Sequence, residues 1–310
     1  MNKQKEIKGI MLAILAATLF GTHPSCVYFL RSEGMEILPT LLISSIQCFA
    51  IYLLILKMTN KINSLKITKL QFKKLLLSSS LFYSTIFLLF ASYSKIPSGL
   101  ATVIHFIYPS LVTIISVLTK RDKLSKSLII AIIATFFGIL LVSNPSNNNL
   151  NPIGIIFAIL SAIVFSLYIY MINDKTFEKL DNTAFVFYIS LFGTILLFII
   201  IFTKSLLINS FTTMWGTFST NVLMGAFALG VTQAIGVLFL AKAIKYIGGP
   251  MGGALTAFEP LTAVLIGTIF FAEKMPFYCL VGCLLILSSI IYLSIAKLRE
   301  NPLSNKKLAK

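Results

Sequence analysis

Charge is scarce in this sequence. Only 12% of the 310 residues are charged, whereas a soluble domain carries about 25%. Histidine occurs twice, tryptophan once, and acidic residues ten times. So few charges exclude an ordinary water-exposed surface over most of the chain. The 57% of hydrophobic residues therefore suit a lipid environment better than a soluble core.

Motifs for catalysis and for metal binding are also missing. No glycine-rich loop is followed by the Lys-Ser/Thr pair of a nucleotide site, and no nucleophile–base arrangement is evident. Cys26, Cys48, Cys279 and Cys283 lie in apolar segments and lack a zinc-site spacing, which favours a packing role. We therefore predict a protein that is not an enzyme and that has no metal and no cofactor.

The net charge of +16 would suit a nucleic-acid partner. The basic residues, however, lie in short connections and at the two ends, and no basic patch with interleaved aromatic residues is present. Loop lysine and arginine are what membrane topology predicts, so we expect no nucleic-acid binding.

Long apolar runs without period-two alternation dominate the chain, and they predict membrane helices instead of a β-barrel. The expected fold class is all-α integral membrane, with ten transmembrane helices. The first is expected to be a retained helix, because no signal cleavage site follows it. The expected spans are 8–30, 37–57, 71–94, 98–119, 125–143, 152–173, 183–203, 220–244, 248–271 and 277–297.

The distribution of basic residues predicts the orientation. One set of alternate connections holds only Arg31, Lys95, Lys204 and Lys274, and the other set, with both termini, holds all the rest. Cytoplasmic connections carry the excess of Lys and Arg, so both termini are expected in the cytoplasm. The expected location is a bacterial inner membrane, with 298–310 as a basic cytoplasmic tail.

The two halves of the chain resemble each other. The stretch 95–109 aligns with 246–260, and 9–20 aligns with 154–165. Five helices therefore occur twice, and because five is odd the second set enters the membrane from the opposite side. Inverted repeats of this kind are typical of secondary transporters that bind cargo near the bilayer midplane. The two expected domains are 8–143 and 152–297.

Paired motifs point to a known family. They are Tyr108-Pro109 and Glu259-Pro260, with the acidic residues Asp122 and Glu273 just after those helices. With them the chain resembles the EamA-type ten-helix transporters of the drug/metabolite transporter superfamily, over about residues 8–297. Asp122 is a mild departure, since that family usually carries Glu there. The resemblance implies two inverted repeats, a central cavity and transport of amino acids, metabolites, cofactors or toxic compounds, often outward.

Glu259 is the leading candidate for function, because it lies in the apolar run 248–271. A charged side chain at the bilayer centre costs roughly 3 kcal/mol on insertion scales. One interpretation is that Glu259 binds a cationic group of the cargo or couples transport to protons. The other is that it bonds to a neighbouring helix beside the Pro260 kink. Both remain open on the sequence alone.

Other polar residues within the spans are also candidates for binding or coupling. For each, the alternative is helix packing or a hydrogen bond between helices. Two histidines and one glutamate could in principle bind a metal, but their spacing gives no support. The candidates are Glu259, His105, Tyr108, Gln233, His23, Tyr83 and Gln47. The expected helix kinks are at Pro24, Pro109 and Pro260.

The sequence thus predicts a secondary transporter that exports a small organic metabolite, such as an amino acid, by alternating access. Its expected partners are that solute and the lipid bilayer, and the spans 125–143 and 277–297 could form a homodimer contact. One alternative is uptake of a cofactor, base or cationic metabolite. Others, from different classes, are a membrane sensor or scaffold and an intramembrane enzyme.

Overall fold

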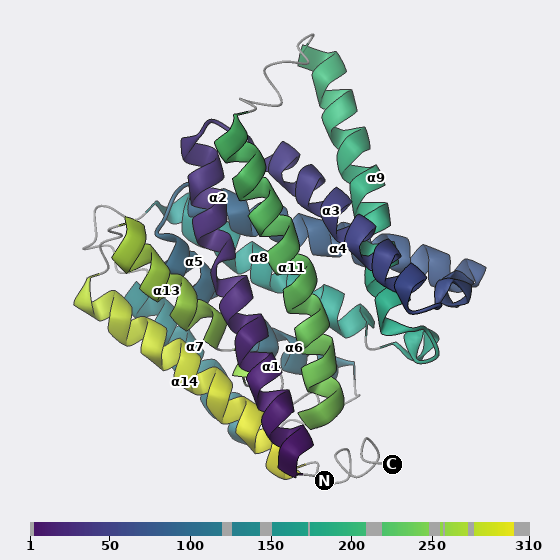
Figure 1. The fold of residues 1–310 in the computed structure, drawn as a ribbon. Helices are drawn as coiled ribbons and strands as arrows, with labels where there is room; N and C mark the ends of the chain where they lie inside the picture. The colour runs from purple at the N-terminus through teal and green to yellow at the C-terminus, as the bar shows by residue number, and fades with distance from the viewer. Residues whose placement is uncertain are drawn as a thin grey trace.

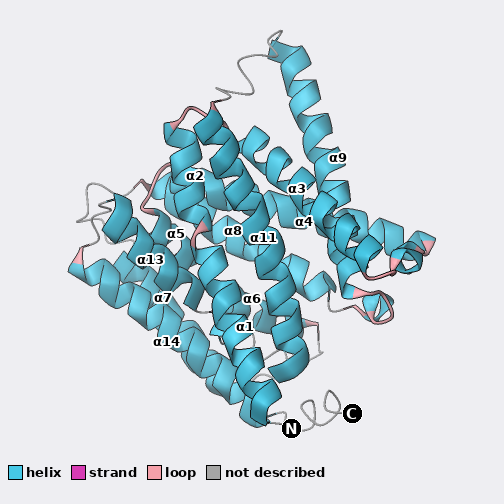
Figure 2. Ribbon diagram, viewed as in Figure 1, coloured by secondary structure: helices cyan, strands magenta, loops and turns pink. Residues whose placement is uncertain are grey.

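The computed structural model describes residues 3–119, 126–142, 151–172, 174–208, 219–247, 255–256, 258–271 and 276–300. These residues form helices and connections, with no strand among them (Figures 1 and 2). The first half holds α1 (Lys3–Gly21), α2 (His23–Ser32), α3 (Ile37–Met58), η1 (Ile62–Leu65), α4 (Lys69–Tyr93), α5 (Ser98–His105), α6 (Tyr108–Leu118) and α7 (Lys126–Val142). The second half holds α8 (Pro152–Ile172), η2 (Lys175–Phe177), α9 (Asn182–Ile208), α11 (Thr220–Ile247), α13 (Phe258–Phe271) and α14 (Phe277–Glu300).

Two of the apolar runs are broken where a proline follows. The first run ends α1 at Gly21 and begins α2 at His23, with Pro24 in the first turn of α2. The fourth run ends α5 at His105, and α6 begins at Tyr108 with Pro109 in its first turn. Proline lacks an N–H and its ring clashes with the carbonyl four residues back, so a continuous helix is disfavoured at both places.

The helices have the length and composition of membrane spans. Seven described segments are long and apolar enough to cross a bilayer: 7–32, 37–58, 69–93, 98–118, 152–172, 182–207 and 220–243. Three shorter apolar helices, 129–138, 258–270 and 280–289, lie where the other three spans are expected. The predicted all-helical fold is confirmed for the described residues, and the chain is a multi-pass membrane protein.

Helices of one half pack on helices of the other half. The helix α1 runs beside α11, and α8 runs beside α4; α3 contacts α9, and α7 contacts α14 (Figure 1). If the halves are exchanged, the pair α1–α11 becomes α8–α4, and each of the other two pairs becomes itself. The packing therefore has the same pattern from either half, which is what an internal repeat produces.

Glycines mark the two equivalent crossings between the halves. A Cβ on Gly9 of α1 would lie 2.6 Å from Cγ2 of Ile247, at the end of α11. A Cβ on Gly154 of α8 would lie 2.8 Å from Cγ2 of Ile96, just after α4. Small residues let membrane helices approach closely. Gly9 aligns with Gly154 and Ile96 aligns with Ile247, so the two crossings are repeats of each other.

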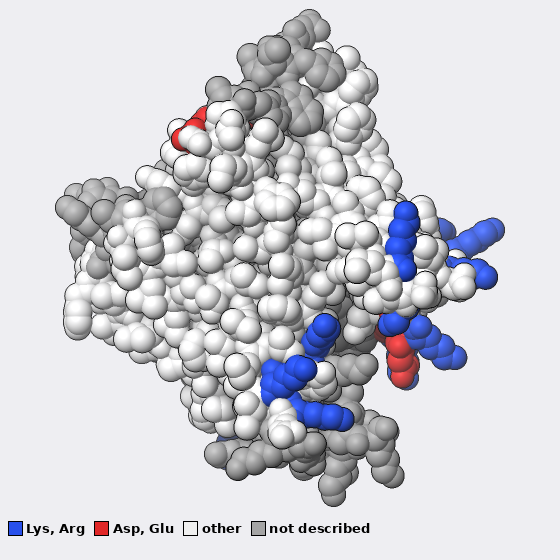
Figure 3. All heavy atoms as spheres, viewed as in Figure 1, with Lys and Arg blue, Asp and Glu red and all other residues white. Residues whose placement is uncertain are grey.

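Charged side chains lie at the ends of the bundle. On the face drawn in Figure 3, lysine and arginine side chains gather on one side of the molecule, and a broad central band shows no charged residue. Large apolar side chains are exposed on the described helices, including Met11, Leu15, Phe136 and Phe227. Lipid tails suit such a surface, because there apolar exposure has no hydration cost.

We expect the two glycine crossings to be sensitive to side-chain size. Gly9→Leu and Gly154→Leu should each destabilise the fold by about 1–3 kcal/mol, because a larger side chain overpacks a close helix contact. Ala50→Leu is the control, since Ala50 is exposed on α3. Thermal unfolding of the purified protein measures the effect. Equal melting temperatures for all three variants would contradict the close crossings.

Candidate functional site

Tyr108 and Glu259 occupy the starts of two equivalent helices and interact electrostatically. Tyr108 begins α6, Glu259 lies in the first turn of α13, and they occupy equivalent positions of the repeats. The Tyr108 side chain hydrogen-bonds the Thr256 side chain and interacts electrostatically with Glu259. The N–H of Glu259 donates to the Thr256 carbonyl at 2.9 Å. A carboxylate suits this place, since a helix N-terminus favours negative charge.

Close backbone contacts fix the position of α13. A Cβ on Gly21 of α1 would lie 2.8 Å from the Glu259 carbonyl oxygen, and one on Gly99 of α5 would lie 2.7 Å from Cα of Val264. Both contacts join α13 to helices of the first half. The carboxylate of Glu259 is therefore carried on a helix that is held directly by α1 and α5.

His105 is anchored by a neighbouring helix. Its Nδ1 lies 2.9 Å from Oγ of Ser161 on α8, and that hydroxyl donates to the Ala158 carbonyl at 2.7 Å. The serine hydrogen is thus already used, so His105 Nδ1 is the donor in this pair. In the neutral ring this leaves Nε2 as an acceptor. His105 itself is buried, with 6% of its surface exposed.

Aromatic rings connect Tyr108 to the interior of the second half. The Tyr108 ring is edge-on to Phe165, with 4.7 Å between the ring centroids. Phe165 stacks on Tyr168 with 5.6 Å between the ring centroids. The His105 ring lies 5.6 Å from Tyr108 and 5.2 Å from Phe165. Edge-on and offset contacts of this kind are favourable aromatic geometries. Tyr168, Phe165 and Tyr108 are named the aromatic path below.

Tyr83 belongs to an adjoining group. Phe82 of α4 lies 5.2 Å from Tyr168, and its ring contacts Tyr83 at 5.4 Å. The Tyr83 side chain hydrogen-bonds Ser45 of α3. Tyr83 is buried and also fills the space opposite Gly193 on α9, so packing accounts for much of its environment.

His23, Gln47 and Gln233 lie around α11, away from the Tyr108 contacts. His23 contacts Phe20 at 5.6 Å, and Phe20 fills the space opposite Gly236 of α11. Gln47 lies against Gly230 of α11. Gln233 is on the same helix, three residues from each of these glycines, and is partly buried. His23 Nε2 and Gln47 Oε1 are buried without a hydrogen bond in the described structure.

A vestibule of about 870 Å³ opens at one end of the second half. Its walls come from the ends of α8 and α11, from η2 and from the start of α9. Tyr168 forms part of the wall, so the aromatic path begins there. The charged residues around it are Lys61, Asp174, Lys175, Glu178, Asp181 and Lys242.

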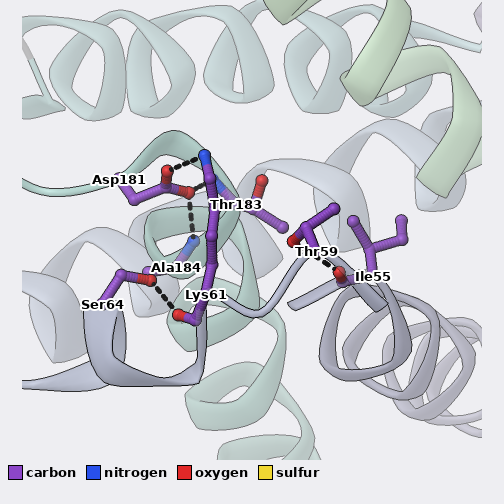
Figure 4. A network of polar contacts seen from close by, with 7 residues as sticks. All are labelled: Ile55, Thr59, Lys61, Ser64, Asp181, Thr183 and Ala184. Carbon is purple, nitrogen blue, oxygen red and sulfur yellow. Dashed lines mark hydrogen bonds and ion pairs between the residues drawn. The ribbon is translucent and has the colours of Figure 1, made fainter. Parts of the chain in front are cut away.

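Polar contacts tie the connection before α4 to the rim of this vestibule (Figure 4). Lys61 Nζ donates to Asp181 Oδ2 at 2.7 Å, and Asp181 also accepts from the N–H of Thr183 at 2.8 Å as the cap of α9. Lys74 Nζ lies 2.7 Å from Asp174 Oδ1 in a second ion pair. These contacts join the first half of the chain to the second.

The two rim carboxylates are held in their charged form. Partial burial acts to raise the pKa of Asp181, but hydrogen bonds from Lys61, Thr183 and Ala184 outweigh it, so the pKa lies below its ordinary value. The pKa of Asp174 is also lowered, by hydrogen bonds from Lys74 and Thr176. Both groups lie outside the membrane spans.

The opposite end of the molecule is packed where the vestibule is open. The helices α3 and α9 begin 145 residues apart, as do Gly9 and Gly154, so residues of α1 to α3 can be matched to those of α8 and α9. Five of the residues that line the vestibule then have buried counterparts, whereas Asp174 and Leu238 match Phe29 and Phe87, which are exposed. The vestibule residues Ile172, Lys175, Val186, Leu240 and Ala241 match Val27, Leu30, Leu41, Leu89 and Phe90, which are 0–9% exposed. All five counterparts belong to one hydrophobic core cluster.

Comparison with known proteins identifies the family. A polytopic helical protein with two alike halves and a vestibule has the architecture of a membrane transporter. The model of the EamA-like transporter family matches residues 7–144 and again 152–295. The chain therefore belongs to this family, which confirms the resemblance seen in the sequence and identifies a membrane transporter.

Two further searches add little about cargo. No curated protein matches the chain. A solved structure described as "Crystal structure of protein" matches with a TM-score of 0.64 and 13% identity, covering 94% of this chain and 98% of the other. At that identity the likeness shows the fold alone.

The structure adds residues that sequence reasoning missed. Ser161 and Thr256 bond to the candidates His105 and Tyr108, and Tyr168 contacts Phe165 between them and the vestibule, yet each is a common residue type in an apolar helix. Only the repeat alignment could have signalled them, because Tyr168 and Thr256 occupy the positions equivalent to His23 and His105. The predicted candidates divide into His105, Tyr108 and Glu259 on one side, the α11 group on the other, and Tyr83 in between.

We expect Asp181 to stabilise the fold in two separable ways. Asp181→Ala removes both the cap and the ion pair and should cost about 1–2 kcal/mol, whereas Asp181→Asn keeps a capping oxygen and should cost less than about 1 kcal/mol. Lys61→Met should lower the stability by about as much as Asp181→Asn, because both variants lose the ion pair and keep a capping oxygen. Thermal unfolding of the purified variants at neutral pH checks the order.

The pH dependence has a definite sign. Because the folded pKa of Asp181 is lowered, the carboxylate stabilises the fold above its unfolded pKa of about 4. That stabilisation is lost as the pH falls through the folded pKa. The advantage of the wild type over Asp181→Asn should therefore shrink in acid. An advantage that stays constant to low pH would contradict the ion pair.

Proposed function

We propose that this protein is a secondary transporter that exports a small organic metabolite, such as an amino acid, by alternating access. Ten helices would cross a bacterial inner membrane as two inverted five-helix repeats, with both termini in the cytoplasm. The protein would not be an enzyme. The observation that carries this proposal is a difference between equivalent residues of the two halves: five residues line the vestibule, and their five counterparts are buried in one core cluster.

Symmetry turns this difference into a mechanism. Equivalent residues of the repeats occupy two environments, so an exchange of those environments gives the mirror state at little cost in new kinds of contact. In that state Leu240 and Ala241 would be packed in the interior. Their equivalents Leu89 and Phe90 would line an open vestibule. The described structure would then be the inward-open state.

The direction of transport is argued from charge. The vestibule rim includes Lys61 and Lys175, which lie in connections of the lysine-rich set, and Lys242, which lies near the end of α11. Since that set is expected in the cytoplasm, cargo would load from inside, as export requires. Uptake would use the same two states in the reverse order. Counterflow in proteoliposomes with a proton gradient of either sign separates export from uptake.

Leu89 and Leu240 offer a matched test of alternating access, because they are the same residue at equivalent positions of α4 and α11. In a background with the four native cysteines replaced, we expect Leu240→Cys to react quickly with a thiol reagent and Leu89→Cys to be protected. Leu240 lines the vestibule, whereas Leu89 is 9% exposed.

Conditions that favour the outward state should then slow the reaction of Leu240→Cys with the thiol reagent and speed up that of Leu89→Cys. The exposed Asn63→Cys, in the connection between α3 and α4, serves as the control, since its reactivity should stay constant. Parallel changes at Leu89 and Leu240, or none under any gradient or solute, would contradict alternating access.

Glu259→Gln tests whether the carboxylate takes part in transport. If Glu259 binds cargo or a proton, the variant should fold normally and lose most of its transport rate, because the amide carries no charge. Counterflow measured across a pH series is the readout. A variant with the wild-type rate and pH profile would remove Glu259 from the mechanism.

A further inference from the structure

Glu259 lies at the inner end of the aromatic path that starts in the vestibule. Tyr168 belongs to the vestibule wall, its ring stacks on Phe165 at 5.6 Å, and Phe165 contacts Tyr108 at 4.7 Å. Tyr108 in turn interacts with Glu259. The first step lies within α8, the second joins α8 to α6, and the last is an electrostatic interaction. The path therefore leads from the vestibule wall to the surroundings of Glu259, which is partly buried.

No described basic side chain neutralises Glu259. In the described part of the chain, the two ion pairs join lysines to Asp181 and Asp174, and both lie at the vestibule rim. Moving an ionised carboxylate away from water is costly unless a cation accompanies it. The environment of Glu259 therefore favours a positively charged visitor and opposes an anionic one.

The aromatic rings along the path also favour a positively charged group. The face of an aromatic ring is electronegative and attracts a cation within about 6 Å. The ring of His105 adds an acceptor, since its Nδ1 is used by Ser161 and the neutral ring leaves Nε2 free to accept. An ammonium group carries three N–H donors, which suits a carboxylate, a phenol oxygen and an imidazole nitrogen together.

On the basis of the proposed transport function, we infer that the cargo is an organic amine: a positively charged nitrogen on an apolar, ring-sized body. The nitrogen would move along Tyr168, Phe165 and Tyr108 to Glu259, while the body packs against the rings. This assigns Glu259 to charge recognition and Tyr108 and Tyr168 to selection of the apolar body.

Three phenyl compounds of similar size and different charge test this inference. They are 2-phenylethylamine, the neutral 2-phenylethanol and the anionic 3-phenylpropionate, each titrated against the full-length protein in detergent and read by thermal shift and by calorimetry. We expect the amine to bind at least tenfold more tightly than the alcohol, and the acid to be weakest. A wild-type protein that binds none of the three, or that binds amine and alcohol equally, overturns the inference.

Substitutions at Glu259 and along the aromatic path test whether the amine binds there. Glu259→Gln should weaken amine binding at least tenfold, and Glu259→Asp should restore part of it because the charge returns. Tyr108→Leu and Tyr168→Leu should each weaken binding severalfold. Tyr292→Leu is the control, because Tyr292 is exposed on α14. Amine binding that survives Glu259→Gln unchanged contradicts the assignment, and the melting temperature without ligand shows whether each variant is folded.

The outcome can be separated from that of the proposed function. If the paired cysteines at Leu89 and Leu240 exchange reactivity but no probe discriminates by charge, transport stands and the amine class fails. If the amine binds at Glu259 but the cysteines never exchange, the site stands and alternating access fails.

Discussion

Close packing between the two halves is the constraint on which the rest of the structure depends. The helix α1 packs on α11 and α8 packs on α4, so neither half forms its own closed bundle. Glycines at the equivalent crossings let the backbones approach, and the same kind of contact holds α13 against α1 and α5. Membrane helices gain little from hydrophobic burial against each other, so such small-residue contacts must supply much of the packing energy.

This interleaved packing places the candidate site at the junction of the halves. Tyr108 and Glu259 come from equivalent helix starts and interact electrostatically, and α5, which precedes Tyr108, packs on α13. His105 is fixed by Ser161, a residue of the opposite half. Every group in this region is thus positioned by contacts between the halves, so a relative movement of the halves would change the site and the vestibule together.

The sequence was sufficient for the all-helical class and for the resemblance of the halves, because apolar length and repeated motifs are local features. It also marked Glu259, since an isolated charge in an apolar run is visible without a structure. It could not show that His105 pairs with Ser161, or that Tyr168 joins the vestibule to Phe165. Those contacts depend on which helices are neighbours, and apolar helices carry little information about their partners. The difference between the vestibule residues and their buried counterparts was likewise invisible, because it depends on how the helices pack and not on residue type alone.

The central claim is that the repeats are inserted in opposite directions, and side-specific labelling measures this most directly. Ser32 follows the first span of one repeat and Glu178 follows the first span of the other, and both are exposed. In a cysteine-free background, a membrane-impermeant thiol reagent should label Ser32→Cys only from outside the cell and Glu178→Cys only from the cytoplasmic side. Labelling of both positions from the same side would contradict inverted repeats and the transport mechanism built on them.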